Sequence, residues 1–96
     1  MNVARILVVQ EDGDGPEYVL RPEPNSVGRA PDSVIRLPYP DVSRQHATIF
    51  PVEGGWKIVD RGSPNGLFVN GNRVKEHVLA DADVIQVGRR KLVFHM

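Results

Sequence analysis

The segment DVSRQH (residues 41–46) places a hydroxyl, a guanidinium and an imidazole close together, directly before an apolar run. Serine and histidine are the nucleophile and base of many hydrolases, but such a pair also needs an orienting acid and an oxyanion hole. Ser43 and His46 are three residues apart in a stretch predicted to be extended, where side chains at that spacing point to opposite faces. The sequence contains no G-x-S-x-G elbow either, so we expect this segment to bind a ligand and not to catalyse a reaction.

Arginine accounts for nine of the twelve basic residues, so planar donors that suit phosphate or carboxylate are plentiful. The twelve basic residues are balanced by twelve acidic ones, which leaves no overall field to recruit nucleic acid or an anionic membrane surface. Any anion site must therefore be local. The N-terminal apolar run ILVV is too short for a signal sequence or a membrane span. We expect no nucleic-acid partner and no membrane insertion.

Metal and cofactor sites are not expected. The chain has no cysteine, and its three histidines (His46, His77 and His95) are scattered, which argues against a thiolate or imidazole metal site. The segment EDGDGPEY (residues 11–18) resembles the start of a calcium-binding loop but lacks the spaced third ligand and the terminal glutamate. We predict instead that it forms the turn of the first hairpin.

The elements that must position the candidate residues are predicted to be strands. Glycine and proline recur along the whole chain and leave no apolar stripe long enough for a helix. The fold class is therefore all-β, and the 96 residues suffice for one domain, residues 1–96, with a single core. Many short strands in so small a domain indicate a two-sheet antiparallel β-sandwich. The strands are expected near residues 3–10, 17–22, 25–28, 34–37, 46–52, 55–60, 67–69, 84–88 and 90–95, with short pieces around 72–79.

In a sandwich the sheets carry the core and the loops at one end carry the site. Four loop groups contain residues suited to binding an anion or to ordering a loop: VGRA (27–30), VSRQH (42–46), SPNG (63–66) and VNG (69–71). The Asn-Gly pairs of the last two groups are typical of tight turns with positive φ. One short strand, LFV, separates these two turns.

In this order the motifs resemble the forkhead-associated (FHA) domain family: Gly28-Arg29, Ser43-x-x-His46, Asn65-Gly66 and Asn70-Gly71. The resemblance covers most of the chain. It implies a β-sandwich of about eleven short strands, of the FHA/SMAD-like type, whose loops at one end bind phosphothreonine peptides. Carried onto this chain, it assigns the phosphate to Arg29, Ser43 and Arg44 and the peptide backbone to Asn65. The residues that it expects to shape the loops are Gly28, His46, Gly66, Asn70 and Gly71.

The same residues suit a phosphate on chemical grounds. Phosphothreonine carries a charge of about −1.5 to −2 and three acceptor oxygens, so its binder needs a fixed cation and neutral donors that converge on it. Arg29 supplies a guanidinium fork and Ser43 a hydroxyl. The Asn65 amide combines an acceptor with two donors and can pair with both polar groups of a peptide backbone.

Each candidate residue also has a plainer interpretation. Arginines such as Arg29 and Arg44 occur in turns as surface charges, and an isolated serine such as Ser43 often bonds its own backbone. Asparagine tolerates left-handed backbone geometry, an interpretation open for Asn65 and favoured for Asn70. For His46 we favour a buried, hydrogen-bonded structural role over direct contact with a ligand. The occurrence of Ser43 and Asn65 alongside Arg29 favours binding.

Two positions depart from the family pattern. Many members have threonine before the asparagine and after the glycine, where this chain has Pro64 and Leu67. Pro64 removes a hydroxyl and a backbone N–H, and it either weakens binding or lowers the entropy cost of ordering the loop. The family also places the residue two before the serine, here Asp41, near the peptide position three beyond the phosphothreonine. We therefore expect Asp41 to disfavour acidic residues at that position.

Together these observations predict a phosphothreonine-dependent protein-protein interaction module that reads the output of Ser/Thr kinases. We expect it to be a cytoplasmic monomer without enzymatic activity. Its phosphoprotein ligand is expected in trans or elsewhere in a longer parent chain, because the single threonine, Thr48, falls in a predicted strand and cannot reach the loops. Two alternatives stay open: a scaffold of the same fold that binds without phosphate, and hydrolysis by Ser43.

Overall fold

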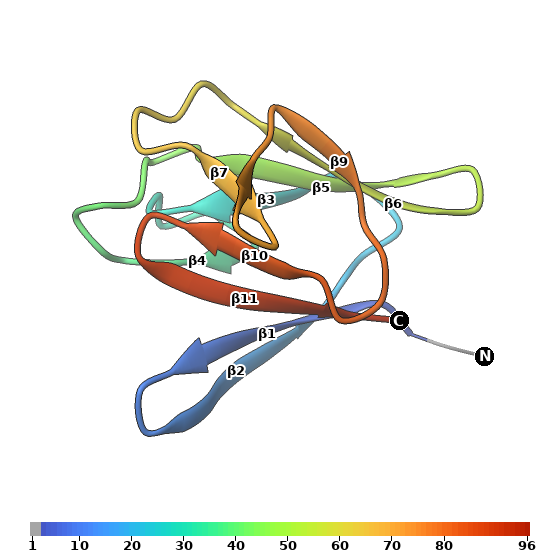
Figure 1. Cartoon of the computed structure of the whole chain (residues 1–96), viewed down its shortest axis with the longest axis horizontal. Coiled ribbons are helices and arrows are strands. Elements are labelled where there is room, and N and C mark those ends of the chain that lie inside the picture. Colours follow the sequence, from blue (N-terminus) through green and yellow to red (C-terminus); the bar gives the residue numbers. More distant parts are fainter. Residues whose placement is uncertain (1–2) are drawn as a thin grey trace.

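The structure, a computed structural model, describes residues 3–96. Within those residues the chain forms eleven strands in two sheets that lie face to face (Figure 1). This arrangement confirms the prediction of an all-β sandwich. No helix long and apolar enough to span a membrane occurs in the described part of the chain.

The larger sheet has six strands, in the spatial order β2 (Gly13–Val19), β1 (Arg5–Gln10), β11 (Arg90–His95), β10 (Val84–Val87), β7 (Leu67–Val69) and β8 (Asn72–Arg73). The smaller sheet has five, in the order β4 (Ile35–Arg36), β3 (Asn25–Gly28), β5 (Ala47–Val52), β6 (Gly55–Asp60) and β9 (Glu76–Val78). Neighbouring strands are antiparallel, except that β3 and β4 run parallel. This short parallel pair departs from the purely antiparallel pairing expected from the sequence.

Alternation of buried and more exposed side chains along the strands builds the core between the sheets. In β1, β5 and β11 the buried side chains alternate with more exposed ones, as expected for strands with one face inward. Burial of one large apolar side chain contributes about 1.5–3 kcal/mol, so the core holds both sheets rigidly under the loops. Side chains without exposed surface come from both sheets and include Ile6, Ile49, Ile58, Ile85 and Phe94.

Strand β2 differs from the expected strand at 17–22 and from the long turn expected at 11–18. The turn is confined to residues 11–12, and the strand already begins at Gly13, which pairs with Gln10. β2 lies at the edge of its sheet, where glycine and proline disrupt fewer ladder bonds and are tolerated. The glycine-rich composition therefore marked an edge strand and not a loop. The bounds of the other long strands differ from the expected ones by at most two residues.

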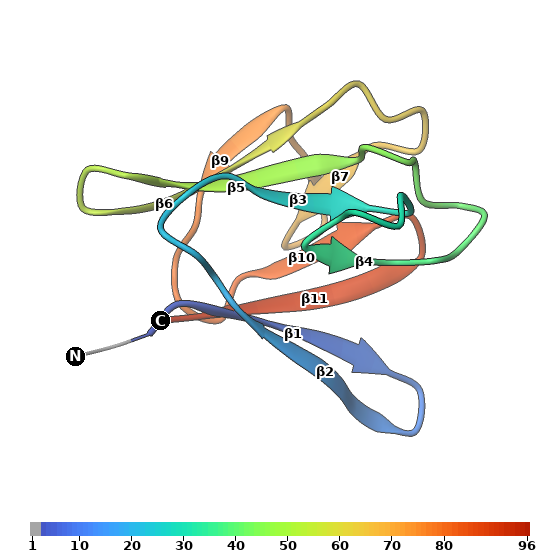
Figure 2. The ribbon, with the colours of Figure 1, turned by 180° about the vertical axis from the view of Figure 1, so that it is seen from behind.

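Four loops gather at one end of the sandwich, those after β3, β4, β6 and β10, and both views show the grouping (Figures 1 and 2). We call this group the loop end. The β5–β6 hairpin and the β9–β10 connection lie at the opposite end. Three of the four loop groups expected to carry the site lie at the loop end, whereas VNG (69–71) belongs to the β7–β8 turn.

Candidate functional site

The loop after β3 lies directly against the loop before β5. Arg29 donates its backbone N–H to the Ser43 carbonyl oxygen at 2.9 Å, and Ala30 donates to that of Arg44 at 3.2 Å. At Gly28 the two segments are so close that a Cβ atom would collide with the Arg44 carbonyl oxygen. Any side chain there would push the loops apart, which is the physical reason for glycine at this position. Backbone contact thus holds the first two motifs together.

The Arg29 guanidinium is anchored by one of its nitrogens. Its Nε donates to the Val42 carbonyl oxygen at 3.0 Å, and the residue is half-buried. This bond fixes the direction of the fork and leaves the paired terminal nitrogens for a ligand. Ser43 is half-buried beside it, and Arg44 is exposed. Arg36 from β4 adds another exposed cation, with its Nε 3.5 Å from the Arg29 carbonyl oxygen.

His46 connects the loop after β4 with the loop after β6. The residue is completely buried. Its Nδ1 accepts the backbone N–H of Ser43 at 3.1 Å, and its Nε2 donates to the Gly66 carbonyl oxygen at 2.8 Å. These two bonds require the neutral tautomer with its proton on Nε2. We call this arrangement the His46 bridge. It holds Ser43 and the Asn65-Gly66 turn in a fixed relation.

The bridge also bears on the possibility of a catalytic Ser-His pair. A general base must present a free nitrogen to the serine hydroxyl. Both ring nitrogens of His46 are engaged by backbone groups, and Ser43 reaches the ring with its N–H. His46 could accept a proton from the hydroxyl only by breaking the bridge, so the pair lacks catalytic geometry.

The β-turn from Ser63 to Gly66 presents Asn65. The Gly66 N–H donates to the Ser63 carbonyl oxygen at 3.2 Å, and Pro64 occupies the second position, where its fixed φ suits a turn. Ser63 is itself buried, and its N–H and hydroxyl both donate to Asp60 Oδ1, at 3.1 and 2.7 Å. The chain's own contacts therefore order this turn.

Asn65 is exposed on this turn, and its Nδ2 donates to the Asp41 carbonyl oxygen at 2.8 Å. One N–H and the Oδ1 remain for a peptide backbone. A left-handed backbone does not explain this asparagine, because the non-glycine residues with positive φ within residues 3–96 are Asn70 (51°) and Ala82 (70°). The plainer interpretation was therefore wrong for Asn65, and it was correct for Asn70.

The two residues that follow Asn65 are buried for different reasons. Gly66 has a φ of 84°, and a Cβ atom there would lie 2.8 Å from Arg73 Nε, so both backbone and space favour glycine. Leu67 is the first residue of β7 and is completely buried in the core. Where many FHA domains have a threonine, this chain has an additional core residue.

Asp41 connects three loops of the loop end. Its carbonyl oxygen binds Asn65, and its Oδ2 accepts the backbone N–H of Arg89 at 2.6 Å. The Arg89 N–H, assisted by the charges of Arg90 and Arg89, holds the pKa of the Asp41 carboxyl below its ordinary value. Asp41, Asn65, Gly88 and Arg89 line a hollow of about 240 Å³.

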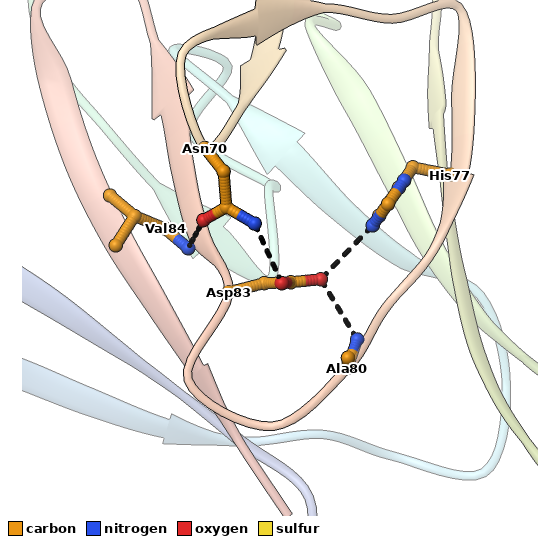
Figure 3. Close-up of polar contacts among 5 residues, drawn as sticks. All are labelled: Asn70, His77, Ala80, Asp83 and Val84. Carbon is orange, nitrogen blue, oxygen red and sulfur yellow. Dashed lines mark hydrogen bonds and ion pairs between the residues drawn. The ribbon is translucent and has the colours of Figure 1, made fainter.

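Asn70 and Gly71 lie away from these loops, at the far end of β7. Leu67 pairs with Val87 and Val69 with Ile85, so the β7–β8 turn lies beside the start of β10. There the Asn70 amide donates to Asp83 Oδ1 and accepts the Val84 N–H, both at 2.9 Å (Figure 3). The structure therefore separates this Asn-Gly pair from the phosphate candidates.

Asp83 is the centre of this second group of contacts. Its Oδ2 accepts the Ala80 N–H at 2.8 Å and lies 3.0 Å from His77 Nε2 (Figure 3). Asp83 is 8% exposed. Burial raises the pKa of its carboxyl, but the hydrogen bonds from Ala80, Asn70 and His77 outweigh burial and keep this pKa below its ordinary value. We call these four residues the Asp83 cluster.

Three residues at the loop end were not expected from the sequence: Arg36, Asp60 and Arg89. The Asp60-x-x-Ser63 pattern is a local one, in which a carboxylate orders the turn that follows, and it could have been recognised. Arg36 and Arg89 reach the site through pairing and through contacts between distant loops. No local signal marks them.

Known proteins resemble this chain in both sequence and structure. The FHA domain family profile matches residues 25–88. The chain is 48% identical over 68 residues to the ABC transporter ATP-binding/permease protein Rv1747 of Mycobacterium tuberculosis, covering 71% of this chain and 8% of that protein. It is 42% identical over 92 residues to the glycogen accumulation regulator GarA of Mycolicibacterium smegmatis, covering 95% of this chain and 58% of that protein.

A solved structure gives the same result for the fold. It comes from a structural and functional analysis of phosphothreonine-dependent FHA domain interactions, and it matches with a TM-score of 0.90 at 36% identity. The match covers 99% of this chain and 97% of that one. The two curated relatives are longer, since the chain spans 8% of one and 58% of the other.

Proposed function

The chain belongs to the forkhead-associated domain family, and we propose that it binds phosphothreonine-containing segments of proteins and so joins proteins in response to Ser/Thr kinases. The family assignment supports the kind of ligand. The arrangement of the loop end supports the place where the ligand binds.

The observation that carries this proposal is the convergence of three loops. Backbone contact holds Arg29 against Ser43, and the His46 bridge holds Ser43 against the turn that presents Asn65. A guanidinium fork, a hydroxyl and an amide are thereby placed together above a rigid core. This set of donors suits a phosphate of charge about −1.5 to −2 on a peptide with unpaired backbone groups.

In this proposal Arg29 and Ser43 bind the phosphate, Arg44 adds a flanking charge, and Asn65 binds the peptide backbone. Pro64 sets the turn in advance, which lowers the entropy cost of ordering the loop. Loop geometry is the task of the residues that do not contact the ligand: Gly28, His46 and Gly66 at the site, and Asn70 and Gly71 at the β7–β8 turn.

The ligand comes from another protein or from another part of a longer parent chain. Thr48, the single threonine of this sequence, lies half-buried in β5, where its hydroxyl accepts a bond from Arg61 at 2.9 Å. Because β5 pairs with β3 on one side and β6 on the other, Thr48 cannot extend to the loop end. The module is proposed to act in the cytoplasm as a monomer.

The proposed function involves no catalysis, metal or cofactor. The engaged ring nitrogens of His46 support this for the Ser43 hydroxyl, and the relative GarA is named a regulator. Unchanged background turnover of an activated ester after Ser43→Ala substitution is the expected result. A loss of turnover with this variant would favour the hydrolase alternative.

Calorimetric titration with two peptides that differ in one phosphate tests the proposal. The domain is expected to bind the phosphothreonine peptide and not its threonine counterpart. Arg29→Ala should weaken binding about ten- to hundredfold, because a hydrogen bond to a charged group contributes about 1.5–3 kcal/mol. Ser43→Ala should weaken it less.

The control variant is Arg5→Ala. Arg5 is an arginine in an exposed ion pair with Glu17, 3.5 Å apart, at the start of β1, the end of that strand opposite the β1–β2 turn, so its removal should leave the affinity unchanged. Equal binding of both peptides by the unaltered domain would contradict the proposal. It would favour the scaffold alternative, in which a partner binds without phosphate.

A further inference from the structure

The β10–β11 turn and the start of β11 carry three consecutive cations next to the proposed site: Arg89 in the turn, and Arg90 and Lys91 in the strand. None of them takes part in the ion pairs formed within residues 3–96. Arg89 binds Asp41 through its backbone N–H, which leaves its side chain uncommitted. Three positive charges at consecutive positions give this region a positive potential, which an anion from outside the domain would lower.

Arg90 is held in place by an aromatic ring. Its guanidinium carbon lies 3.6 Å from the centre of the Tyr39 ring. Its Nε is buried and has no hydrogen-bond partner among the residues that the structure describes. Stacking on a ring face fixes the guanidinium plane and leaves the two terminal nitrogens, but not the buried Nε, to donate to a ligand. Arg90 is therefore a cation that is fixed in advance and incompletely satisfied by its own chain.

Three adjoining hollows share Arg89 and form a groove. The first is the 240 Å³ hollow at Asn65 and Asp41. The second, of about 420 Å³, continues along Pro40, Asp41 and Arg90. The third, of about 460 Å³, is lined by Val9, Gln10, Glu11, Tyr39, Arg89, Arg90 and Lys91. The groove thus runs from the proposed peptide-backbone contact to the β1–β2 turn.

The balance of charge along this groove becomes more positive toward its far end. Asp41 lies near its start, beside Asn65. Arg89 lines the groove along its whole length, and the hollow at the far end is also lined by Arg90 and Lys91, with a single carboxylate, that of Glu11. A ligand chain leaving Asn65 along the groove would first pass Asp41, whose charge is balanced by Arg89, and would then reach a region in which cations outnumber carboxylates. Extended chain advances about 3.3 Å per residue, so the two regions contact different ligand residues.

We propose that this groove binds an anionic side chain, a carboxylate or a second phosphate, carried by the same protein segment as the phosphothreonine. The stacked Arg90 fork receives the anion, and Arg89 and Lys91 add charge and donors. Asp41 makes the preference position-dependent, since an acidic residue is disfavoured beside Asp41 and favoured farther along the groove. This inference rests on the proposed function, because the phosphothreonine anchors the ligand at the start of the groove.

The test uses phosphothreonine peptides with alanine at every flanking position, into which a single glutamate or phosphoserine is moved outward, one residue at a time, on each side. On one flank, glutamate at the outer positions should raise the affinity about three- to fivefold, and phosphoserine about tenfold. The gain should shrink as salt is raised. Comparison of the two anions distinguishes a carboxylate ligand from a doubly phosphorylated one.

The second part of the test replaces the three cations at the β10–β11 turn and the start of β11. Lys91→Gln should reduce the gain from the outer anion and leave the affinity of the all-alanine phosphopeptide unchanged. Arg89→Gln should also reduce the gain; because Arg89 lines the hollow at Asn65 too, its gain is measured relative to the variant's own affinity for the all-alanine phosphopeptide. Arg90→Lys keeps the charge and loses the stacked fork, and it should reduce the gain without a large change in melting temperature. The matched control is Lys57→Gln, a lysine paired with Glu76 on the other sheet, which should leave the gain intact.

The outcomes separate this inference from the function on which it rests. If no phosphothreonine peptide binds better than its threonine counterpart, the proposed function fails. If the all-alanine phosphopeptide binds but no outer anion improves its affinity, the groove inference alone is wrong. The same conclusion holds if the gain persists in Arg89→Gln, Arg90→Lys and Lys91→Gln.

Discussion

The His46 bridge and the Asp83 cluster use one structural device at two ends of the sandwich. In each, a buried polar side chain binds groups from separate segments of the chain. His46 is a neutral ring with one donor and one acceptor, and it joins the loops that present Ser43 and Asn65. Asp83 is an acceptor for three donors and joins the β7–β8 turn to the segment before β10.

The difference between them lies in what the joined loops expose. Next to the His46 bridge, Arg29, Arg44 and Asn65 present donors that the chain leaves partly unpaired. In the Asp83 cluster, Asn70 is engaged through both its amide nitrogen and its amide oxygen. A bridging side chain is thus not itself a sign of a binding site. The unpaired donors beside the bridge distinguish a binding site from a structural contact. Stability and affinity should be coupled at His46 and uncoupled at Asp83.

Substitution of the bridge should have the largest effect. His46→Ala removes a completely buried ring and leaves the Ser43 N–H and the Gly66 carbonyl group without partners, at a cost of about 2–4 kcal/mol in the free energy of unfolding. Each kcal/mol lowers the melting temperature by about 4–8 °C in a domain of this size. Affinity for a phosphothreonine peptide should fall as well, because binding must then order both loops.

The control for this substitution is His95→Ala, which removes a half-buried imidazole from a pair with the exposed Asp81, 3.6 Å away, and should change both quantities much less than His46→Ala does. A fully stable His46→Ala variant that does not bind would indicate that His46 contacts the ligand directly.

Removal of the carboxylate at the other end should lower stability alone. Asp83→Ala leaves the Asn70 amide and the Ala80 N–H without an acceptor and should cost about 2–3 kcal/mol in unfolding free energy. Peptide affinity, measured below the lowered melting temperature, should equal that of the unaltered domain. A parallel loss of affinity would show that the two ends are coupled and that the comparison fails.

Lowering the pH should protonate the Asp83 carboxyl and reduce the free energy of unfolding. The pKa of the Asp83 carboxyl is below its ordinary value in the folded state, so its contribution to stability is present above the unfolded pKa of about 3.9 and is lost as pH falls through the lower folded value. Urea unfolding between about pH 5 and pH 2 should show this loss. The loss of unfolding free energy in acid should be smaller for Asp83→Asn, because the amide side chain of this variant does not titrate.

Asp81→Asn is the matched control for the acid experiment. The Met96 N–H holds the pKa of the Asp81 carboxyl below its ordinary value, but this side chain is exposed. Its substitution should alter the pH profile less than Asp83→Asn does. Identical profiles for the unaltered domain and Asp83→Asn would mean that other carboxylates determine acid stability.

The smallest expected effect concerns the backbone of the segment that holds Asp83. Ala82 has a φ of 70°, a left-handed conformation that costs an L-residue about 1–2 kcal/mol. Ala82→Gly relieves this strain but adds entropy to the unfolded chain, for a net gain of up to about 1 kcal/mol. The urea midpoint should rise with the m-value and the peptide affinity unchanged. A fall in the midpoint would show that the Ala82 side chain contributes more through packing than its conformation costs.

The sequence was sufficient for features encoded locally. Strand β5 was expected because an apolar run begins at Ala47 and ends before the turn residues EGG, and the all-β class followed from the spacing of glycine and proline. Strand β2 was misplaced because an edge strand tolerates the glycines that a central strand does not. Most residues of β2 are exposed, so this strand has few apolar residues, and its composition resembled that of a turn.

The site divides in the same way. Gly28, Ser43, His46 and Asn65 belong to short motifs whose order could be recognised. The bond between Asp41 and Arg89 joins residues 48 positions apart and depends on how two loops meet, which no local pattern encodes. Leu67 illustrates the converse, since a departure from the family motif proved to be a core residue.

The most direct test of the central claim is the titration of backbone amide resonances with a phosphothreonine peptide. The claim is that the ligand binds at the loop end, held in shape by the His46 bridge. The largest shifts are expected at Arg29, Ser43, Arg44 and Asn65, with the amides of Asn70, Ala80 and Val84 unchanged, and the threonine peptide should cause no saturable shift. Saturable shifts centred on the Asp83 cluster, or the same shifts with and without phosphate, would contradict it.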